Sequence, residues 1–246
     1  MILGDSQSNA PPLKRAIVFV DWQNLFRCIK EAFQYHFPNY DVKKLAEMVC
    51  LQNGWLLSEV RFYTGVPDRT KDPFWASFWE KKFAQMGTRG VKHFKRKLMY
   101  DNVSVEPGFV PPSREKGIDV RIALDIVLKT IDNAYDVAVI FSQDQDLSEA
   151  VKEAISIAKG QKRFVSMYSA FPASESYKNS SPIRPSKPLI FNKDSYDGCI
   201  DPADYRPKNI PPPKRSYSIR TEGVKASIKD GANIIDRRKI IDRQDK

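Results

Sequence analysis

Residues 135–149 have the sequence YDVAVIFSQDQDLSE, which places two carboxylates directly after a predicted buried strand. The apolar run at 137–141 is rich in β-branched side chains and too short for a helix, so it predicts a strand buried on both faces. Apolar residues then recur at helical spacing from Leu147 until Gly160, where we expect the helix to end. Asp144 and Asp146 lie between the two elements. Because ligands of open parallel α/β sheets bind beyond the carboxyl ends of the strands, we expect a functional site at these acids.

Asp146 also has a purely structural interpretation. With Glu149 three residues later, it fits a helix N-cap and its capping-box partner. That role does not explain Asp144.

The same pattern occurs near the N-terminus and continues along the chain. The run AIVFV at 16–20 ends at Asp21 and is followed by a helical pattern that Pro38 stops. Further strands are predicted at 60–63, 163–168 and 189–191, and further helices at 42–51, 74–86 and 118–131. This alternation predicts an α/β fold, a three-layer α/β/α sandwich with a mostly parallel central sheet.

Composition limits the possible chemistry and partners. The 246 residues have a net charge of +10, which favours a polyanion such as nucleic acid over a membrane surface. Three scattered cysteines and two histidines leave little for thiolate or imidazole metal sites or for Ser-His-Asp catalysis. Without a signal peptide or a run of about 18 apolar residues, we expect a cytoplasmic protein that does not bind membranes.

The domain organisation follows from shifts in composition. Residues 1–14 are mostly polar and contain prolines, so they predict a disordered leader, and the body at 15–200 has enough apolar residues for one core. Residues 201–246 are Pro-rich and contain twelve basic and seven acidic side chains, so they form a basic and partly disordered tail.

The helix predicted at 118–131 has two acids with different expected roles. Arg121, Asp125 and Lys129 are spaced four apart, which predicts ion pairs on an exposed face. Asp119 is in the first turn, on the packed face, and either interacts with the helix dipole or points to a ligand.

The predicted strand at 91–100 is strongly basic. Lys92, Lys95 and Arg96 alternate with aromatic residues, a pattern that suits contact with a nucleic-acid backbone. An exposed edge strand protected by lysines explains the same pattern equally well.

The acids converge in the predicted fold. Asp21 and Asp144 end strands, Asp146 follows closely, and Asp119 begins a helix at the same end of the sheet. Clustered carboxylates repel one another unless a cation neutralises them, and oxygen ligands select hard ions such as Mg²⁺ or Mn²⁺. An acidic metal pocket in a basic protein suggests phosphodiester hydrolysis.

Three segments resemble the signatures of the NYN domain, a PIN-like nuclease family: AIVFVDWQNL at 16–25, KGIDVRIALD at 116–125 and VAVIFSQDQDL at 137–147. The resemblance covers about residues 15–200 and implies a PIN-like sandwich and a metal-dependent ribonuclease that binds one or two divalent ions. Carried over by position, the family's acids match Asp21, Asp119, Asp144 and Asp146, and its polar residue after the first strand matches Asn24. With Asn24, the candidates for substrate binding are Lys92, Lys95, Arg96 and Lys116.

The sequence departs from the family at two positions. Trp22 and Gln143 stand where the family usually has glycine, and their bulk could narrow the pocket. Trp22 either packs in the core or offers its ring to a base; we favour packing, because tryptophan is mostly buried and Asn24 is expected on the exposed side of the turn.

Two functions remain open. The first is an endoribonuclease that acts on single-stranded RNA, and the second is a catalytically weak or inactive RNA-binding or interaction module of the same fold. A phosphatase with an aspartyl nucleophile is disfavoured, because no second acid stands two residues after Asp21. A homo-oligomer is possible.

Overall fold

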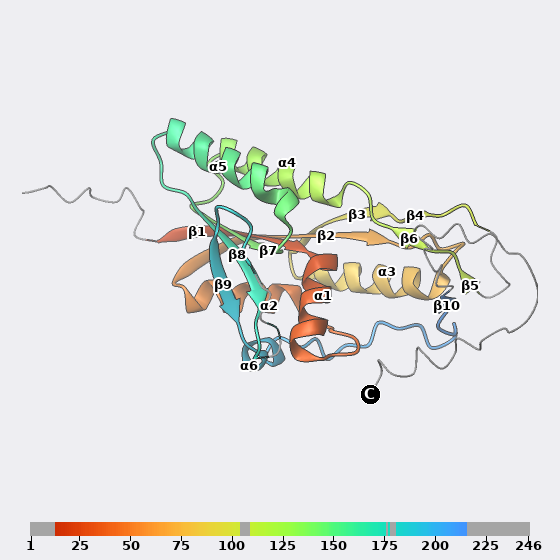
Figure 1. Cartoon of the computed structure of the whole chain (residues 1–246). Helices are drawn as coiled ribbons and strands as arrows, with labels where there is room; N and C mark the ends of the chain where they lie inside the picture. The colour runs from red at the N-terminus through yellow and green to blue at the C-terminus, as the bar shows by residue number, and fades with distance from the viewer. Residues whose placement is uncertain (1–12, 104–108, 176, 178–180, 216–246) are drawn as a thin grey trace, which may run out of the picture. The chain divides into compact units, whose positions relative to one another are not determined.

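Six parallel strands form one central sheet in the order β3-β2-β1-β7-β8-β9 (Figure 1). The computed structural model describes residues 13–103, 109–175, 177 and 181–215. The strands of this sheet are β1 (Lys14–Asp21), β2 (Trp55–Val66), β3 (Lys92–Lys97), β7 (Val137–Phe141), β8 (Ser166–Pro172) and β9 (Lys187–Phe191). The predicted parallel α/β sheet is confirmed.

Helices connect the strands as expected for a parallel sheet. They are α1 (Trp22–Phe33), α2 (Val42–Gln52), α3 (Pro73–Thr88), α4 (Ile118–Ile131), α5 (Ser148–Gly160) and the short α6 (Lys193–Asp197), with a 3-10 turn, η1 (Gln145–Leu147), before α5. Short strands lie outside the main sheet: β4 (Met99–Tyr100) pairs with β6 (Ser113–Arg114), and β5 (Phe109–Val110) pairs with β10 (Lys214–Arg215).

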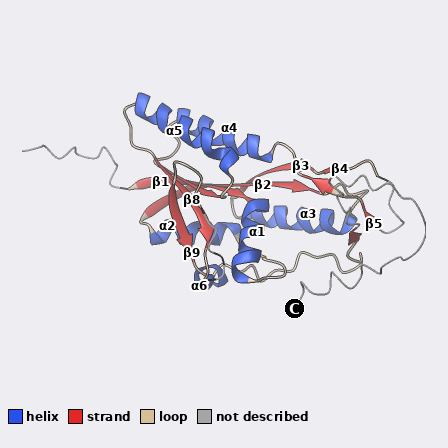
Figure 2. Cartoon of the chain, viewed as in Figure 1, coloured by secondary structure: helices blue, strands red, loops and turns tan. Residues whose placement is uncertain are grey.

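The central strands are buried on both faces. In β1, Ala16, Val18 and Val20 face a core with α1, α2 and α3, whereas Ile17 and Phe19 face a second core with α4 and α5. Figure 2 shows these two helix layers on opposite sides of the sheet. Because successive side chains of a strand point to opposite faces, an uninterrupted apolar run supplies both cores at once.

The order of the strands reverses direction at β1. The chain builds outward from β1 to β2 and β3, and then returns to place β7, β8 and β9 on the other side of β1. In an open α/β sheet, the loops that leave two strands at such a switch point diverge to opposite faces and leave a crevice between them. Here that crevice lies beyond Asp21 and Phe141, the last residues of β1 and β7.

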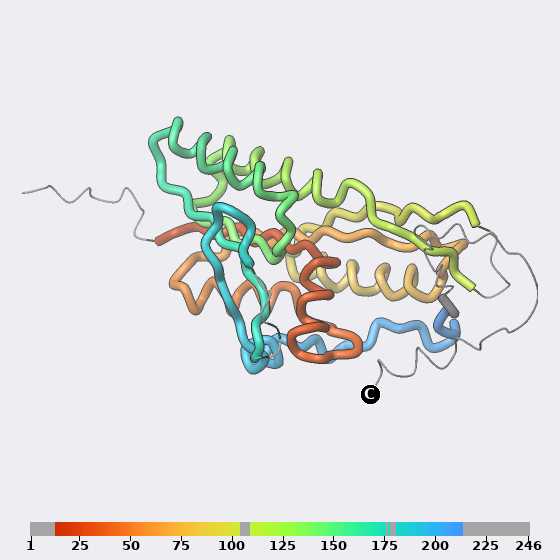
Figure 3. The backbone as a smooth tube through the Cα atoms, in the orientation of Figure 1, coloured from red at the N-terminus to blue at the C-terminus, as the bar shows by residue number. Residues whose placement is uncertain are grey.

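The folded body continues past residue 200. After α6 the chain runs along the side of the sheet covered by α1 and α3 (Figure 3). Asp201 is buried and lies 3.5 Å from the ammonium group of Lys82 on α3, and the ring of Tyr205 packs on Phe78. The packed chain therefore includes the first residues of the segment that the sequence assigned to the tail. The leader residues 1–12 and the tail residues 216–246 lie outside the described residues.

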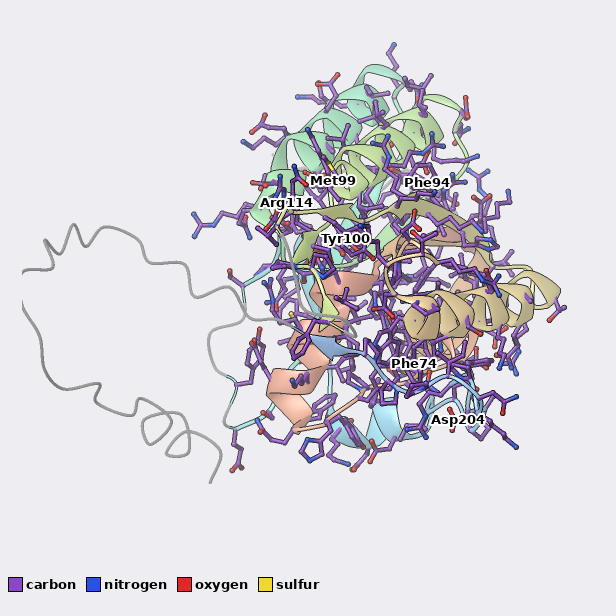
Figure 4. The ribbon with its side chains drawn as sticks, turned by 90° about the vertical axis from the view of Figure 1, so that its right-hand side faces the viewer. Phe74, Phe94, Met99, Tyr100, Arg114 and Asp204 are labelled. Carbon is purple, nitrogen blue, oxygen red and sulfur yellow. The ribbon has the colours of Figure 1, made fainter. Side chains whose placement is uncertain are left out.

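Figure 4 shows the end of the molecule toward which β2 and β3 point. Met99, Tyr100 and Arg114 are labelled there on the β4–β6 pair, which follows β3. Among the described residues, none of the helices has the length and apolar character needed to cross a membrane.

Asp125 corrects a prediction from the sequence. It was expected on an exposed face of α4, but its side chain is only 4% exposed and binds Arg61 of β2 at 2.6 Å, with a further hydrogen bond from the hydroxyl of Tyr63. The predicted pair with Arg121 is present at 2.9 Å. Burial alone would raise the pKa of Asp125, but the hydrogen bonds from Tyr63 and Arg61 hold it below its usual value. Helical periodicity could not reveal that β2 presents an arginine to this helix.

The burial of Asp125 predicts a large effect of Asp125→Asn on stability. Removing one partner of a buried ion pair leaves an uncompensated charge, so we expect a loss of about 3 kcal/mol in the free energy of unfolding, measured by urea denaturation. Asp204→Asn is the matched control, because its pair with Arg206 is solvent-exposed and its loss should leave the free energy of unfolding almost unchanged. If Asp125→Asn lowered the free energy of unfolding by only a few tenths of a kcal/mol, Asp125 would not belong to a buried network of ion pairs.

Candidate active site

A cavity of about 390 Å³ lies at the switch point between β1 and β7. Four carboxylates and two basic side chains line it together with polar and small residues, namely Asp21, Gln23, Asn24, Arg27, Glu115, Lys116, Gly117, Ile118, Asp119 and Asp144. Three of the four predicted acids and two of the predicted substrate-binding residues, Asn24 and Lys116, thus line one space. We call this space the acidic cavity.

Asp21 is the most deeply buried of these acids. It caps α1 by accepting a hydrogen bond from the backbone N–H of Asn24 at 3.1 Å, and its other oxygen accepts one from the hydroxyl of Ser142 at 3.1 Å. Burial raises the pKa of Asp21 to about 6, against the opposing effect of these two hydrogen bonds, and the nearby charge of Asp144 raises it further. The fold therefore maintains a carboxylate in a position that disfavours its charge.

Asp144 is connected to Asp21 through Ser142. The backbone N–H of Asp144 donates to the hydroxyl of Ser142 at 3.1 Å, and this hydroxyl in turn donates to Asp21. Asp144 also caps η1 by accepting from the backbone N–H of Asp146 at 3.1 Å. The two strand-end acids are thus held in a fixed relation by backbone geometry and one hydroxyl group.

Asp119 reaches the cavity from the first turn of α4. The residue before this helix, Gly117, has a left-handed φ of +74° and provides no side-chain cap. An added Cβ at Gly117 would lie 2.8 Å from Nη1 of Arg96, a flexible side-chain end that can move aside, so the left-handed backbone is the reason for glycine here. Arg96 of β3 therefore lies beside the rim of the cavity, as a substrate-binding role would need.

Glu115 is the lining acid that the sequence analysis missed. Its Oε1 accepts a hydrogen bond from the backbone N–H of Gly65 at the end of β2. Burial raises the pKa of Glu115 to about 6 despite this bond, with smaller increases from the charges of Asp21 and Asp119. Glu115 lies in a proline-rich segment without periodicity, and its only sequence signal is its place directly before the KGIDV segment.

The other predicted site residues lie elsewhere. Asp146 is exposed in η1 and does not line the cavity. Lys92 and Lys95 are exposed on the edge strand β3, where Lys92 pairs with Glu59 at 2.8 Å and Lys95 lies over the ring of Phe83. Their proposed contact with nucleic acid stays a prediction.

Trp22 packs in the core, as favoured from the sequence. It is 8% exposed, stacks on Tyr40 at 5.4 Å and meets Trp79 edge-on at 5.1 Å. The supporting reason was wrong, because Asn24 is buried and Gln23 occupies the exposed side of the turn. The amide oxygen of Asn24 instead accepts from the backbone N–H of Gln143 at 3.0 Å and so connects α1 to the loop after β7.

Gln143 points away from the acids. Its Oε1 accepts hydrogen bonds from the hydroxyl of Tyr177 and the thiol of Cys28, both at 3.3 Å, and its amide nitrogen donates to the carbonyl of Ser181. Neither bulky residue therefore fills the acidic cavity.

The donors in the cavity suit a hard divalent cation. All four acids offer oxygen atoms, and two of them have raised pKa values that a cation would lower. Within the described ranges, no three acidic, histidine or cysteine side chains are grouped closely enough to hold an ion by themselves. Mg²⁺ typically keeps several waters and uses only one or two carboxylates together with substrate phosphate, so an ion here would need oxygen atoms from water and phosphate to complete its coordination.

Comparison with protein families identifies the chain. The model of the NYN domain matches residues 15–181, which is more than half of the sequence. The chain belongs to the NYN domain family. The NYN domain is a PIN-like nuclease family, and the six-stranded parallel sheet with its helices is consistent with that fold. This membership supports a nuclease-type function.

Other comparisons add little. A search of curated proteins finds no significant match. Among solved structures, a protein of unknown function from Vibrio parahaemolyticus is similar, with 17% sequence identity and a TM-score of 0.43 over 74% of this chain and 95% of the other.

The raised pKa of Asp21 predicts an unusual pH dependence of stability. Because the folded protein binds this proton more tightly than the unfolded chain, the contribution of Asp21 to the free energy of unfolding should fall as pH rises from about 4 to about 6. Asp21→Asn removes this loss. At pH 7 the free energy of unfolding of the variant should therefore exceed that of the natural protein by up to about 3 kcal/mol, with no such gain at pH 4. Urea denaturation across this range measures the difference. Parallel pH curves for the two proteins would show that Asp21 is not held in this way.

Proposed function

We propose that this NYN-domain protein is a metal-dependent endoribonuclease that cleaves single-stranded RNA at the acidic cavity. The observation that supports the proposal best is the meeting of Asp21, Glu115, Asp119 and Asp144 with Arg27 and Lys116 in one cavity at the switch point of the sheet. Carboxylates alone would repel a phosphodiester, and basic residues alone would bind it without activating water. Their combination suits hydrolysis of a phosphate backbone.

The backbone also favours a phosphate in this place. The helices α1 and α4 and the 3-10 turn before α5 all begin at residues that line the cavity or adjoin it. The N-terminus of a helix presents free N–H groups and the positive end of its dipole, which stabilise anions. Arg27 and Lys116 add two full positive charges, and Arg96 lies close to the rim beside Gly117. These groups would bind the scissile phosphate and orient it toward the acids.

Asp21 and Asp144 are the best candidates to bind Mg²⁺ or Mn²⁺, with Glu115 and Asp119 as further oxygen donors. A bound ion would lower the pKa of an attacking water and screen the phosphate from the surrounding carboxylates. Ser142 and the N–H of Asn24 fix the orientation of the Asp21 carboxylate, and a bound ion would lower its pKa from about 6.

The alternative is a non-catalytic RNA-binding module. The spacing of the acids favours it, because an ion would depend on waters and substrate for most of its ligands. In that case, the basic residues and helix N-termini would bind RNA, and the carboxylates would serve only to cap helices and connect strand ends.

Replacing the acids distinguishes the two functions. Asp21→Asn and Asp144→Asn should each lower Mn²⁺-dependent cleavage of a single-stranded RNA by about 100-fold or more while the fold is kept, because each removes a carboxylate that would hold the ion, and the ion supplies several kcal/mol of charge stabilisation. Asp132→Asn is the matched control, because Asp132 is exposed at the opposite end of α4 from Asp119. Full activity in both cavity variants would rule out these acids as the catalytic centre.

Thermal unfolding provides a readout that is independent of activity. If the cavity binds the ion, Mn²⁺ should raise the Tm of the natural protein and of Asp132→Asn, but raise it much less in Asp21→Asn, because only the folded state offers the site. The shift should shrink below about pH 6, where protons compete for Asp21. An equal Tm shift in all three proteins would favour the binding module.

A further inference from the structure

A second cavity adjoins the acidic one and has a different character. It encloses about 380 Å³ between α1, the end of β2 and α3. Six aromatic side chains line it, with a few polar and small groups: Trp22, Phe26, Phe37, Trp75, Phe78 and Trp79, together with Gln23, Thr64, Gly65, Pro67, Leu98, Ser113 and Glu115. We call this cavity the aromatic groove.

Its outer rings are held in fixed orientations. Phe37 and Trp75 stack on each other at 5.3 Å with an angle of 27°, and Phe26 meets Phe37 edge-on at 5.7 Å. Beneath them, Trp22 and Trp79 are almost fully buried. Phe37 remains 37% exposed, and Phe26 and Trp75 are half-buried. The groove therefore offers preformed ring surface that a ligand can reach without opening the core.

The two cavities share part of their walls. Gln23 and Glu115 line both of them, so the first turn of α1 and the residue before Lys116 separate an acidic space from an aromatic one. Glu115 keeps this position because Gly65 has no side chain. An added Cβ at Gly65 would lie 2.5 Å from Leu98 and 2.6 Å from Cγ of Glu115, both of which line the groove.

We infer that the aromatic groove binds an unpaired nucleobase next to the phosphate held in the acidic cavity. In a nucleic-acid strand a flat aromatic group adjoins every phosphate, and that arrangement matches an aromatic space adjoining an acidic and basic one. Bases stack on aromatic side chains with little sequence preference. The polar groups of Ser113 and Glu115 among the lining residues suit the hydrogen-bonding edge of a base.

The inference rests on the proposed function and specifies its substrate. A base that is paired and stacked in a duplex must leave the helix before it can enter a groove, which costs a few kcal/mol. An unpaired base enters without that cost. The groove would thus select single-stranded regions and position the neighbouring phosphodiester at the acids.

Binding of a strand with a missing base tests the groove directly. One probe is a short, fluorescently labelled oligoadenylate. The others are the same strand with one abasic nucleotide, placed at each position in turn. The affinity for each strand is measured without divalent cation. In the natural protein, one abasic position should weaken binding by about fivefold to a hundredfold, the equivalent of one base–aromatic stack. The other positions should have little effect.

Phe37→Leu should remove this sensitivity, because leucine keeps the apolar contact and loses the ring face. The variant should bind the intact strand as weakly as the natural protein binds the sensitive abasic strand, and the missing base should then make no further difference. Leu51→Ala is the matched control, since Leu51 is 82% exposed on α2 and does not line the groove. If Phe37→Leu does not fold, Phe26→Leu, at another half-buried ring of the groove, replaces it.

Intrinsic fluorescence gives a second signal. Three of the four tryptophans, Trp22, Trp75 and Trp79, line the groove, whereas Trp55 packs on Tyr168 elsewhere. The intact strand should therefore quench tryptophan emission, and the strand with the sensitive base removed should quench it less.

The outcomes separate this inference from the nuclease function. If the protein cleaves RNA with Mn²⁺ but binds all abasic strands equally, base binding in the aromatic groove is wrong and the nuclease function is supported. If binding depends on one base, Phe37→Leu abolishes this dependence and no cleavage occurs, base binding in the groove is supported and the nuclease function is wrong. Wild-type affinity of Phe37→Leu for every strand would assign the groove to another ligand, such as an apolar peptide, and overturn the inference.

Discussion

The hydrogen bond from Ser142 to Asp21 joins the ends of the two strands on which the site depends. β1 and β7 are parallel neighbours in register from Ala16 opposite Val137 to Val20 opposite Phe141, so the residues that follow them emerge side by side. Burial of Asp21 disfavours its charge, and the hydroxyl of Ser142 with the N–H of Asn24 compensates only in part. A cation near such a carboxylate would stabilise its charge. The metal site proposed above depends on this incomplete compensation.

The rest of the fold maintains this arrangement. α1 begins at Asp21, α4 brings Asp119 to the same space, and the loop after β7 is fixed to α1 through Asn24 and Gln143. On one side of the sheet, Asp125 and Arg61 attach α4 to β2, and on the other, Lys82 and Asp201 attach the chain after α6 to α3. Buried ion pairs of this kind contribute little net stability, but breaking them is costly, so they favour one relative placement of helix and sheet.

The two positions that depart from the family pattern serve packing in this chain. Trp22 belongs to a cluster of rings that includes Tyr40, Phe62 and Trp79, and Gln143 belongs to a polar contact with Cys28 and Tyr177. Both side chains lead away from the acids, and the acidic cavity stays open in their presence. Trp22 instead forms the inner wall of the aromatic groove, so the departure that raised doubt about activity supplies a surface beside the proposed catalytic centre.

The sequence by itself determined the layers of the fold and three of the four lining acids. Apolar runs such as 16–20 and 137–141 fix buried parallel strands, and an acid at the end of such a run must lie at the carboxyl edge of the sheet.

The tertiary structure alone decided what depends on neighbours distant in the chain. Glu115 enters the site through Gly65, fifty residues away. Asp125 is buried because β2 presents Arg61 to it, and Asp146 stays outside because the chain turns after Asp144. Periodicity reports which face of an element is apolar, but not which polar partner another element places opposite it.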